Sequence, residues 1–212
     1  MDKYYSSRYV FDPARAIVWK EIVRFLSPYI PRDGVVLDLG AGYCDFINQV
    51  KAVRRYAVDS SEELTRYATE EVQVIRSAAW DCVGIADGSV DVVHASNLLE
   101  HFDDDELAKT MAEIRRLLKP KGKLILLQPN FRLSIKHYFD DPTHKKVFTD
   151  AALGHFLESH GFDVVLARPR FLPFSMRSRP SIIPVMPWMI RAYISSPFKP
   201  FAGQMLFIAE KV

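Results

Sequence analysis

Short apolar runs and longer amphipathic segments alternate along most of the chain. The short runs are rich in Val, Ile and Leu and are bounded by polar or turn-forming residues. Such runs are typical of strands that are buried on both faces, because those strands have few positions facing water. They predict strands at residues 35–39, 54–59, 72–78, 90–96, 123–129, 162–169 and 204–212.

Apolar residues at helical spacing fill the segments between these runs. The clearest case is residues 103–119, where Leu107, Met111, Ile114 and Leu118 repeat along one face, after three aspartates at the N-terminal end. Further helices are predicted at residues 14–30, 45–52, 60–71 and 150–160. Strands that alternate with helices predict an α/β fold, with a mainly parallel sheet that is covered by helices on both faces.

Length and cysteine content limit the possible classes of protein. A chain of 212 residues with 49% hydrophobic residues can bury one sizeable core, so we expect a single domain over residues 1–212. Cys44 and Cys82 have neither metal-ligand spacing nor the number needed for a disulfide framework. Charged residues near the N-terminus replace the apolar core of a secretion signal, and the longest uncharged run near the C-terminus, residues 180–190, contains three prolines. We therefore expect a cytoplasmic protein.

Charge is distributed unevenly along the chain. The formal net charge is +2, but residues 164–209 contain no Asp or Glu. Their six positive charges are Arg168, Arg170, Arg177, Arg179, Arg191 and Lys199. Residues 170–203 also carry prolines and aromatic residues, and they form an insertion between the last two predicted strands. Three interpretations remain open: the insertion wraps the body, covers a bulky acceptor as a lid, or contacts an anionic membrane at its inner face.

A glycine turn follows the first predicted strand, in the segment LDLGAGYCDF at residues 37–46. Ligands of open α/β sheets lie beyond the carboxyl ends of the strands, so Asp38, Gly40 and Gly42 are placed at the edge of a ligand site. A dinucleotide-binding turn would have a third glycine where this chain has Asp45. Because the carboxylates of Asp38 and Asp45 would repel a pyrophosphate, the turn favours a cationic ligand instead.

A second acid completes this pattern. Asp59 ends the second predicted strand, in the position of an acid that accepts hydrogen bonds from a ribose diol. Together Asp38 and Asp59 favour a ligand with an ammonium group, a ribose and no phosphate. S-adenosylmethionine is such a ligand.

Four segments, spread over residues 35–161, resemble the class I S-adenosylmethionine-dependent methyltransferases, of the subgroup that methylates small molecules. In chain order they are VVLDLGAGYCDF, RYAVDSS, DGSVDVVHASNLLEHF and EIRRLLKPKGKLILLQPN. The resemblance implies a Rossmann-like fold with a seven-stranded, mainly parallel sheet whose last strand is antiparallel. It also implies an enzyme with S-adenosylmethionine as cofactor and S-adenosylhomocysteine as product.

The resemblance assigns cofactor-binding roles to ten residues: Asp38, Gly40, Ala41, Gly42, Asp59, Ser60, Ala79, Trp80, Ser96 and Asn97. The glycine turn would hold the methionine end, and Asp59 would hold the ribose. Ala79 and Trp80 would lie beside the adenine, although many relatives have an Asp-Ala pair there. Cys44 stands where the family often has a third glycine, which suggests tighter packing.

The segment after the fifth strand, residues 130–150, supplies the catalytic candidates His137, Tyr138 and His144. A methyl transfer to oxygen is helped by a general base, whereas a neutral amine needs less help. Asp140, Asp141 and His144 do not match a usual metal-ligand spacing, so we predict no metal site. His101 has two interpretations, as a packing residue or as a catalytic one. His94, His155 and His160 are expected to be structural.

The resemblance also suggests that residues 1–30 form an N-terminal helix and a lid, in which Tyr5, Arg8 and Tyr9 contact the cofactor. We expect a small-molecule or glycan- or lipid-linked acceptor that is methylated at oxygen. Three other functions are considered: a non-catalytic partner protein that keeps the cofactor fold, a nucleic-acid methyltransferase and a nicotinamide-dependent dehydrogenase. The mildly acidic body disfavours nucleic acid, and the glycine pattern disfavours the dehydrogenase.

Overall fold

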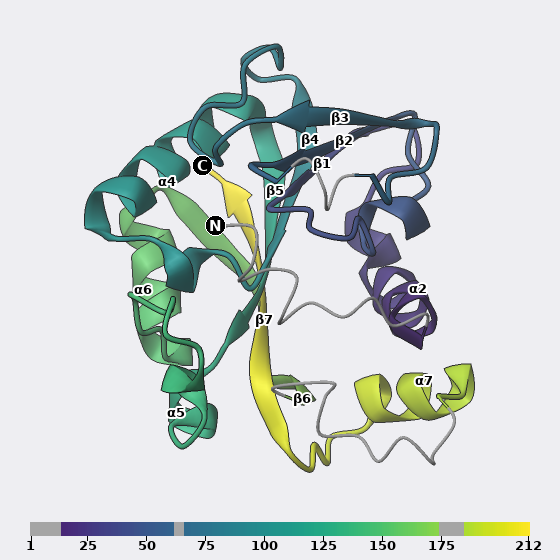
Figure 1. Cartoon of the computed structure of the whole chain (residues 1–212), viewed down its shortest axis with the longest axis vertical. Coiled ribbons are helices and arrows are strands. Elements are labelled where there is room, and N and C mark those ends of the chain that lie inside the picture. The colour runs from purple at the N-terminus through teal and green to yellow at the C-terminus, as the bar shows by residue number, and fades with distance from the viewer. Residues whose placement is uncertain (1–13, 62–65, 174–184) are drawn as a thin grey trace.

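The computed structural model describes residues 14–61, 66–173 and 185–212, and its central feature is one seven-stranded sheet (Figure 1). The strand order is β3-β2-β1-β4-β5-β7-β6. The strands are β1 (Val35–Leu39), β2 (Arg54–Asp59), β3 (Val72–Arg76), β4 (Val90–Ser96), β5 (Leu118–Pro129), β6 (Phe162–Pro173) and β7 (Ala202–Lys211). Among these strands β7 alone runs opposite to the other six, so the predicted fold class is confirmed.

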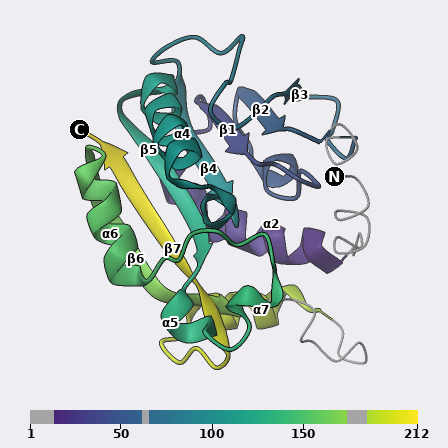
Figure 2. The same ribbon diagram turned by 60° about the vertical axis from the view of Figure 1, so that its left-hand side comes forward.

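Helices cover both faces of the sheet, as the strand pattern predicts (Figures 1 and 2). On one face α4 (Asp104–Leu117) and α6 (Asp150–Ser159) pack against residues such as Leu37 and Leu124. On the other face α2 (Ala14–Leu26) and α7 (Pro187–Ser195) pack against residues such as Val36 and Ile125. Successive strand residues point to opposite faces, so adjacent positions of one strand feed two separate cores.

Short helical segments occupy several connections. They are η1 (Ser27–Tyr29), η2 (Ile47–Gln49), η3 (Leu99–His101), α5 (Phe131–Ser134) and η4 (Tyr138–Asp140). Two of the longer helices, α4 and α6, begin at side-chain caps. Asp103 accepts a hydrogen bond from the Glu106 amide and Glu106 accepts one from the Asp103 amide, while Thr149 caps α6. None of the helices in the described ranges is long and apolar enough to cross a lipid bilayer.

The helix predicted at residues 45–52 is wrong, because the structure has only the single turn η2 there. Cys44 adopts a left-handed backbone conformation, with φ of 57°, just before this segment. The Asn48 side chain then donates to the Tyr67 carbonyl and accepts from the Thr69 amide. These contacts tie the segment to the next connection instead of extending a helix.

The helix predicted at residues 60–71 is also wrong over its described C-terminal part. Residues 66–71 form turns, and residues 62–65 lie outside the described ranges. The Thr69 amide is bonded to the side chain of Asn48, so it is not available for a helical bond.

The boundaries of the late strands differ from those predicted. β6 continues to Pro173 rather than ending at 169, and β7 begins at Ala202. The connection between them is therefore residues 174–201, of which 174–184 lie outside the described ranges. Its described part contains α7, which packs against α2 through Ile194. The predicted lid residues Tyr5, Arg8 and Tyr9 also lie outside the described ranges.

Candidate functional site

The glycine turn after β1 joins the ends of β1 and β2. The amides of Gly40 and Ala41 both donate to the Val58 carbonyl, at 2.8 and 3.0 Å. Gly40 and Gly42 adopt positive φ values of 71° and 51°, a conformation that glycine takes without a steric penalty. A Cβ atom at Gly40 would lie 2.8 Å from Leu98, whereas a Cβ atom at Gly42 would meet nothing within 4 Å among the described residues. These residues therefore leave the backbone at Gly42 open to the approach of another group.

Cys44 takes the conformation that a third glycine would have in this turn. Its φ is 57° and its side chain is completely buried. Burial, with the nearby carboxylates of Asp38 and Asp59, raises the pKa of the Cys44 thiol to about 12. The thiol therefore stays protonated and acts as a small apolar side chain, not as a nucleophile.

Asp59 connects the end of β2 to the glycine turn. One carboxylate oxygen accepts from the Gly42 amide at 2.9 Å, and the other accepts from the Ser61 amide at 2.8 Å. Burial raises the pKa of Asp59, although these two amide bonds act in the opposite direction. Ser60, which lies between Asp59 and Ser61 in the sequence, is exposed. The structure thus brings Asp59 and Gly42 into contact at one edge of the sheet.

Asp38 lies in β1 and pairs with a histidine of the neighbouring strand. Its carboxylate is 2.7 Å from Nδ1 of His94, and Asp38 and His94 are register partners in the β1–β4 ladder. Both side chains are buried, and the His94 ring stacks on Phe46 at a centroid distance of 3.7 Å with Trp19 at its edge. The expectation that His94 is structural agrees with this position. The sequence did not indicate that Asp38 is the partner of His94, because this requires knowing that β1 and β4 are neighbours in the sheet.

The loop after β3 contains the two residues expected beside adenine. Ala79 is buried, and the half-buried Trp80 packs edge-on against Phe102 at a centroid distance of 5.6 Å.

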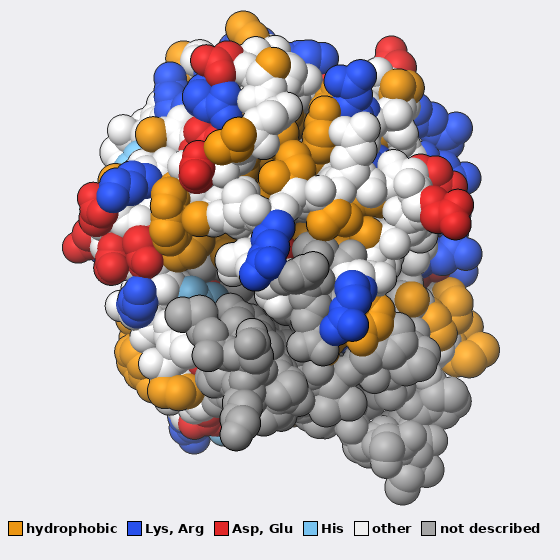
Figure 3. Space-filling model, turned by 45° about the horizontal axis from the view of Figure 1, so that its top comes forward, with side chains coloured by type: hydrophobic (Ala, Val, Ile, Leu, Met, Phe, Trp, Pro, Cys, Tyr) orange, Lys and Arg blue, Asp and Glu red, His pale blue; other side chains and the backbone are white. Residues whose placement is uncertain are grey.

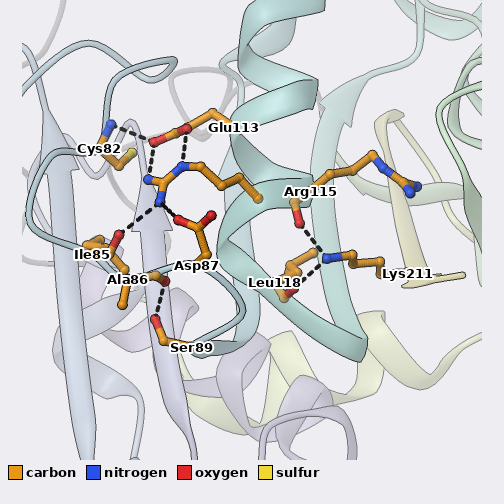
Figure 4. A network of polar contacts seen from close by, with 10 residues as sticks. Cys82, Ile85, Ala86, Asp87, Ser89, Glu113, Arg115, Leu118 and Lys211 are labelled. Carbon is orange, nitrogen blue, oxygen red and sulfur yellow. Dashed lines mark hydrogen bonds and ion pairs between the residues drawn. The ribbon is translucent and has the colours of Figure 1, made fainter.

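Contacts with α4 hold this loop in place. The Cys82 amide donates to Glu113, and the guanidinium of Arg116 bonds to Glu113, to Asp87 and to the Ile85 carbonyl (Figure 4). The predicted adenine side of the site is therefore fixed to a long, capped helix.

Ser96 ends β4 and Asn97 follows it, at the same edge of the sheet. Asn97 has a positive φ of 49°, a conformation that asparagine tolerates better than most residues. Its amide donates to the Leu127 carbonyl at 2.8 Å, and its side-chain oxygen accepts from Gln204 at 3.0 Å. Its side-chain nitrogen donates to the Ser96 hydroxyl at 3.2 Å. These bonds fix Asn97 between β4, β5 and β7.

The three catalytic candidates occupy different environments. The His137 side chain is 69% exposed and lies 3.0 Å from Asp140. Tyr138 is fully buried, its hydroxyl donates to the Lys146 carbonyl at 2.6 Å, and burial raises its pKa. His144 is partly buried, and its ring lies 4.9 Å from the ring of His101. His144 also lies 4.6 Å from the Tyr138 ring, and it is the one of the three whose ring belongs to a group of atoms that could hold a metal ion.

That cluster consists of Glu100, His101 and His144. One ligand-type atom from each of the three residues lies within 4.8 Å of the other two. Both carboxylate oxygens of Glu100 are buried without a hydrogen-bond partner among the described residues. Burial raises the pKa of Glu100 to about 8, and burial together with His144 lowers the pKa of His101.

The loop that contains His144 is fastened to the segment that contains Glu100. The amides of Lys145 and Lys146 donate to the Glu100 carbonyl at 2.8 and 3.0 Å. His101 Nδ1 lies 2.9 Å from the Thr143 hydroxyl, which donates to Asp141 at 2.6 Å. Sequence analysis grouped His144 with Asp140 and Asp141 and missed Glu100. The sequence contains the three residues in two separate segments, LEH at residues 99–101 and DPTH at residues 141–144.

Comparison with known proteins places this site in a family. A family model described as a methyltransferase domain matches residues 11–167. The chain belongs to this family. The methyltransferase is 30% identical over 179 residues to an uncharacterized protein, MJ0638, of Methanocaldococcus jannaschii, covering 80% of this chain and 74% of that protein. It is 34% identical over 115 residues to a dimethylglycine N-methyltransferase of Parasynechococcus marenigrum, covering 49% and 40% of the two chains.

Solved structures show the same fold. A SAM-dependent methyltransferase of Archaeoglobus fulgidus superposes with a TM-score of 0.70 at 24% identity, covering 93% of this chain and 94% of that one. A 1,6-didemethyltoxoflavin-N1-methyltransferase of Burkholderia thailandensis, solved with S-adenosylhomocysteine bound, gives a TM-score of 0.63 at 20% identity over 100% of this chain and 84% of that one. The predicted family, an enzyme family with S-adenosylmethionine as its methyl donor, is therefore confirmed.

Proposed function

We propose that this methyltransferase binds S-adenosylmethionine at the glycine turn and transfers the methyl group to a hydroxyl oxygen of a small-molecule acceptor. The observation that carries the proposal is the contact of Asp59 with the Gly42 amide at 2.9 Å. It joins an acceptor for the ribose diol to the open backbone of the glycine turn. Ala41 would line the methionine end with Asp38 and Gly40.

The remaining predicted cofactor residues surround the same edge. Ser60 would follow the ribose, and Ala79 and Trp80 would flank the adenine. Ser96 and Asn97 would face the transferred methyl group, because they lie at the carboxyl end of β4, next to β1 in the sheet.

The transfer itself is an in-line displacement. The bond between the methyl carbon and the sulfonium sulfur breaks, a bond from that carbon to the acceptor oxygen forms, and the hydroxyl proton leaves. The enzyme mainly has to align the two reactants and exclude water. Glu100 and His101 follow β4 and His144 lies in the loop after β5, so the cluster lies at the carboxyl ends of the strands, where an acceptor would bind. We assign activation of the acceptor hydroxyl to this cluster rather than to His137 or Tyr138.

An acceptor of small size is favoured over one embedded in a membrane. Two of the six positive charges in residues 164–209 are used within the fold: Arg191 lies 3.1 Å from Glu21, and Lys199 bonds to the carbonyls of Tyr193 and Ile194. Trp188 and Phe201 are nevertheless 62% and 91% exposed near α7. A glycan- or lipid-linked acceptor is therefore kept as the second choice, to be tested with liposomes that contain anionic lipid. The cytoplasmic location also stays a prediction.

An amine acceptor is the alternative reaction. Two relatives are named as N-methyltransferases, the dimethylglycine enzyme and a phosphoethanolamine N-methyltransferase of Triticum aestivum that is 23% identical over 178 residues. A neutral amine already carries the lone pair that attacks the methyl group, so it depends less on the Glu100 cluster. Paired hydroxyl and amine acceptors with the same carbon skeleton would separate the two reactions.

The distribution of charged side chains on the described surface also favours one class of acceptor. Acidic and basic side chains are interspersed on the face shown in Figure 3, with hydrophobic side chains between them. A nucleic-acid track requires cations that gather along one path. We therefore propose an acceptor without a phosphate backbone.

Calorimetric titration with S-adenosylmethionine and S-adenosylhomocysteine tests the cofactor site. We expect Asp59→Ala to weaken binding at least about tenfold, or about 1.4 kcal/mol, because the ribose loses its acceptor. Asp163→Ala, at the far edge strand β6, is the matched control and should bind like the wild type. Binding of NADH in place of S-adenosylmethionine, or equal affinities of the two variants, would contradict the proposal.

A further inference from the structure

We propose that Glu100, His101 and His144 bind one divalent transition-metal ion of the zinc type beside the methyl-transfer site. Two imidazoles and one carboxylate are a ligand set that Zn²⁺ uses when a further position stays open for a substrate. The binding of the ion stands on the geometry of these three side chains. Its action on the acceptor rests on the proposed function.

The three ligand atoms are close enough to share an ion. They lie within 4.8 Å of one another, and two ligands of one tetrahedral zinc ion are about 3.4 Å apart when each bond is about 2.1 Å. Adjustments of about 1 Å in each side chain therefore close the site. The two segments that supply the ligands are already held together, because Lys145 and Lys146 donate their amides to the Glu100 carbonyl.

Glu100 supplies the strongest indication that a cation belongs there. Its side chain is 0% exposed, and neither oxygen has a hydrogen-bond partner among the described residues. A carboxylate buried without a partner is costly, and proteins usually satisfy it with a paired cation or a metal. The basic groups beside it are the imidazoles of His101 and His144, which are themselves metal ligands.

His101 is oriented as a metal-ligating histidine usually is. Because the Thr143 hydroxyl donates to Asp141, it accepts from Nδ1 of His101, which must therefore carry the ring proton. This leaves the lone pair of Nε2 for an ion. A ring nitrogen bonded to a hydroxyl and then to a carboxylate is the outer arrangement that fixes the tautomer and raises the basicity of the ligand.

A bound ion would change how the acceptor is activated. It would coordinate the acceptor hydroxyl as a Lewis acid and lower its pKa, so that the proton passes to solvent and the resulting alkoxide attacks the methyl carbon. The three side chains would then act as ligands, and none of them would need to accept the proton itself.

Metal titration of the full chain tests the site directly. The protein is treated with a chelator, dialysed and titrated with Co²⁺, whose visible absorption reports coordination, and then with Zn²⁺ as competitor. We expect one equivalent of Co²⁺ to bind and Zn²⁺ to displace it. Glu100→Gln and His144→Asn should lose this binding, whereas His155→Asn, an exposed histidine of α6, should retain it.

A second set of variants keeps the result interpretable. Thr143→Val removes the hydroxyl that orients His101 and leaves all three ligands in place, so we expect Co²⁺ affinity to fall about 10- to 100-fold. Circular dichroism of each variant checks that it is folded, and His144→Asn serves if Glu100→Gln is not. Absence of Co²⁺ and Zn²⁺ binding by the wild type, or equal binding by His144→Asn, would overturn the metal site.

The same samples separate this inference from the proposed function. S-adenosylmethionine titration of the chelator-treated protein reports the cofactor site alone. Metal binding without cofactor binding would contradict the proposed methyl donor and leave the metal site standing. Cofactor binding without metal binding would do the reverse.

Discussion

Two clusters of carboxylate and histidine lie near the same edge of the sheet, and they are built in opposite ways. Asp38 and His94 are strand residues in register, they bond directly at 2.7 Å, and Phe46 and Trp19 enclose the histidine. Glu100, His101 and His144 lie on connections, and the Glu100 carboxylate has no hydrogen-bond partner among the described residues.

This difference indicates that the first cluster stabilises the fold, whereas the second is available to bind a ligand. A direct pair between two central strands is enclosed by rigid neighbours and adds to the fixed frame of the site. A cluster on connections, with a buried carboxylate left open, keeps bonding capacity for a ligand. We therefore expect changes at the first cluster to act mainly on stability, with a loss of cofactor binding as well at Asp38, and changes at the second to alter binding at the acceptor side and the pH response.

Breaking the first cluster should have the largest effect on stability. Asp38→Ala leaves His94 buried beside a cavity and without its carboxylate partner. Removing one member of a buried pair typically costs about 3–5 kcal/mol, so we expect the free energy of unfolding to fall by that amount. Urea denaturation measures it.

The double variant Asp38→Ala/His94→Leu is the control for this prediction. Replacing both partners removes the unpaired group, so it should recover part of the lost stability. A loss below about 1 kcal/mol for Asp38→Ala would show that the pair does not support the frame.

The second cluster should make stability depend on pH. Burial raises the pKa of Glu100 to about 8 in the folded chain, against its usual value of 4.5. Between these values the folded state binds more protons than the unfolded state, so stability falls as pH rises. The slope is about 1.4 kcal/mol per pH unit, which gives a loss of about 2–3 kcal/mol from pH 5.5 to 7.5.

Urea denaturation of the chelator-treated protein at these two pH values checks this result. Glu100→Gln has no titrating group at this position and should remove that part of the slope. Saturating Zn²⁺ should also flatten it, because a bound ion favours the ionised carboxylate. A wild type and a Glu100→Gln variant with the same slope would contradict the assignment.

Gly40 and Leu98 lie next to each other between the two clusters, and a substitution at Gly40 should cost less stability than the changes above. Gly40 lies two residues after Asp38, Leu98 lies two residues before Glu100, and an added Cβ would come within 2.8 Å of Leu98. Gly40→Ala combines a left-handed backbone with this overlap, so we expect a loss of about 2 kcal/mol. Gly42→Ala has the same backbone penalty but open space, so about 1 kcal/mol is expected.

Thermal unfolding of these two variants gives their order. Gly42→Ala should still weaken S-adenosylmethionine binding, because its methyl group enters the open space over the turn. Stronger destabilisation by Gly42→Ala than by Gly40→Ala would contradict the roles of these glycines.

The parts of the fold that depend on local pattern could be predicted from sequence. The apolar runs place all seven strands, and the helical spacing with its aspartates places α4. The turn at Gly40 and Gly42 was predicted from residue type, since both positions need a positive φ. The segment at residues 45–52 failed because its eight residues have a weak helical pattern, and the side-chain bonds of Asn48 to Tyr67 and Thr69 cannot be seen in a local window.

The clusters depend on contacts between distant residues, and this is why they were missed. Asp38 and His94 are 56 residues apart, and their pairing requires that β1 and β4 be neighbours in a known register. Glu100 and His144 come together only because the loop after β5 folds back onto η3. Sequence pattern singled out Asp38 and His144 as polar groups after strands or near strand ends, but it could not show which residues they meet.

The smallest expected effect is at His137, and it sharpens the assignment of His144. His137 is 69% exposed, its partner Asp140 is 70% exposed, and surface pairs of this kind contribute about 0–1 kcal/mol. We expect His137→Asn to change the free energy of unfolding by less than about 0.5 kcal/mol and to leave Co²⁺ binding and methyl transfer intact. His144→Asn should lose Co²⁺ binding in the same assays.

The contrary result would be a fall in turnover of about 100-fold for His137→Asn, which is the effect expected when a general base is removed. The exposed loop, and not the Glu100 cluster, would then activate the acceptor hydroxyl. The two histidines lie in one short connection, so their opposite behaviour would come from burial and partners rather than from place in the chain.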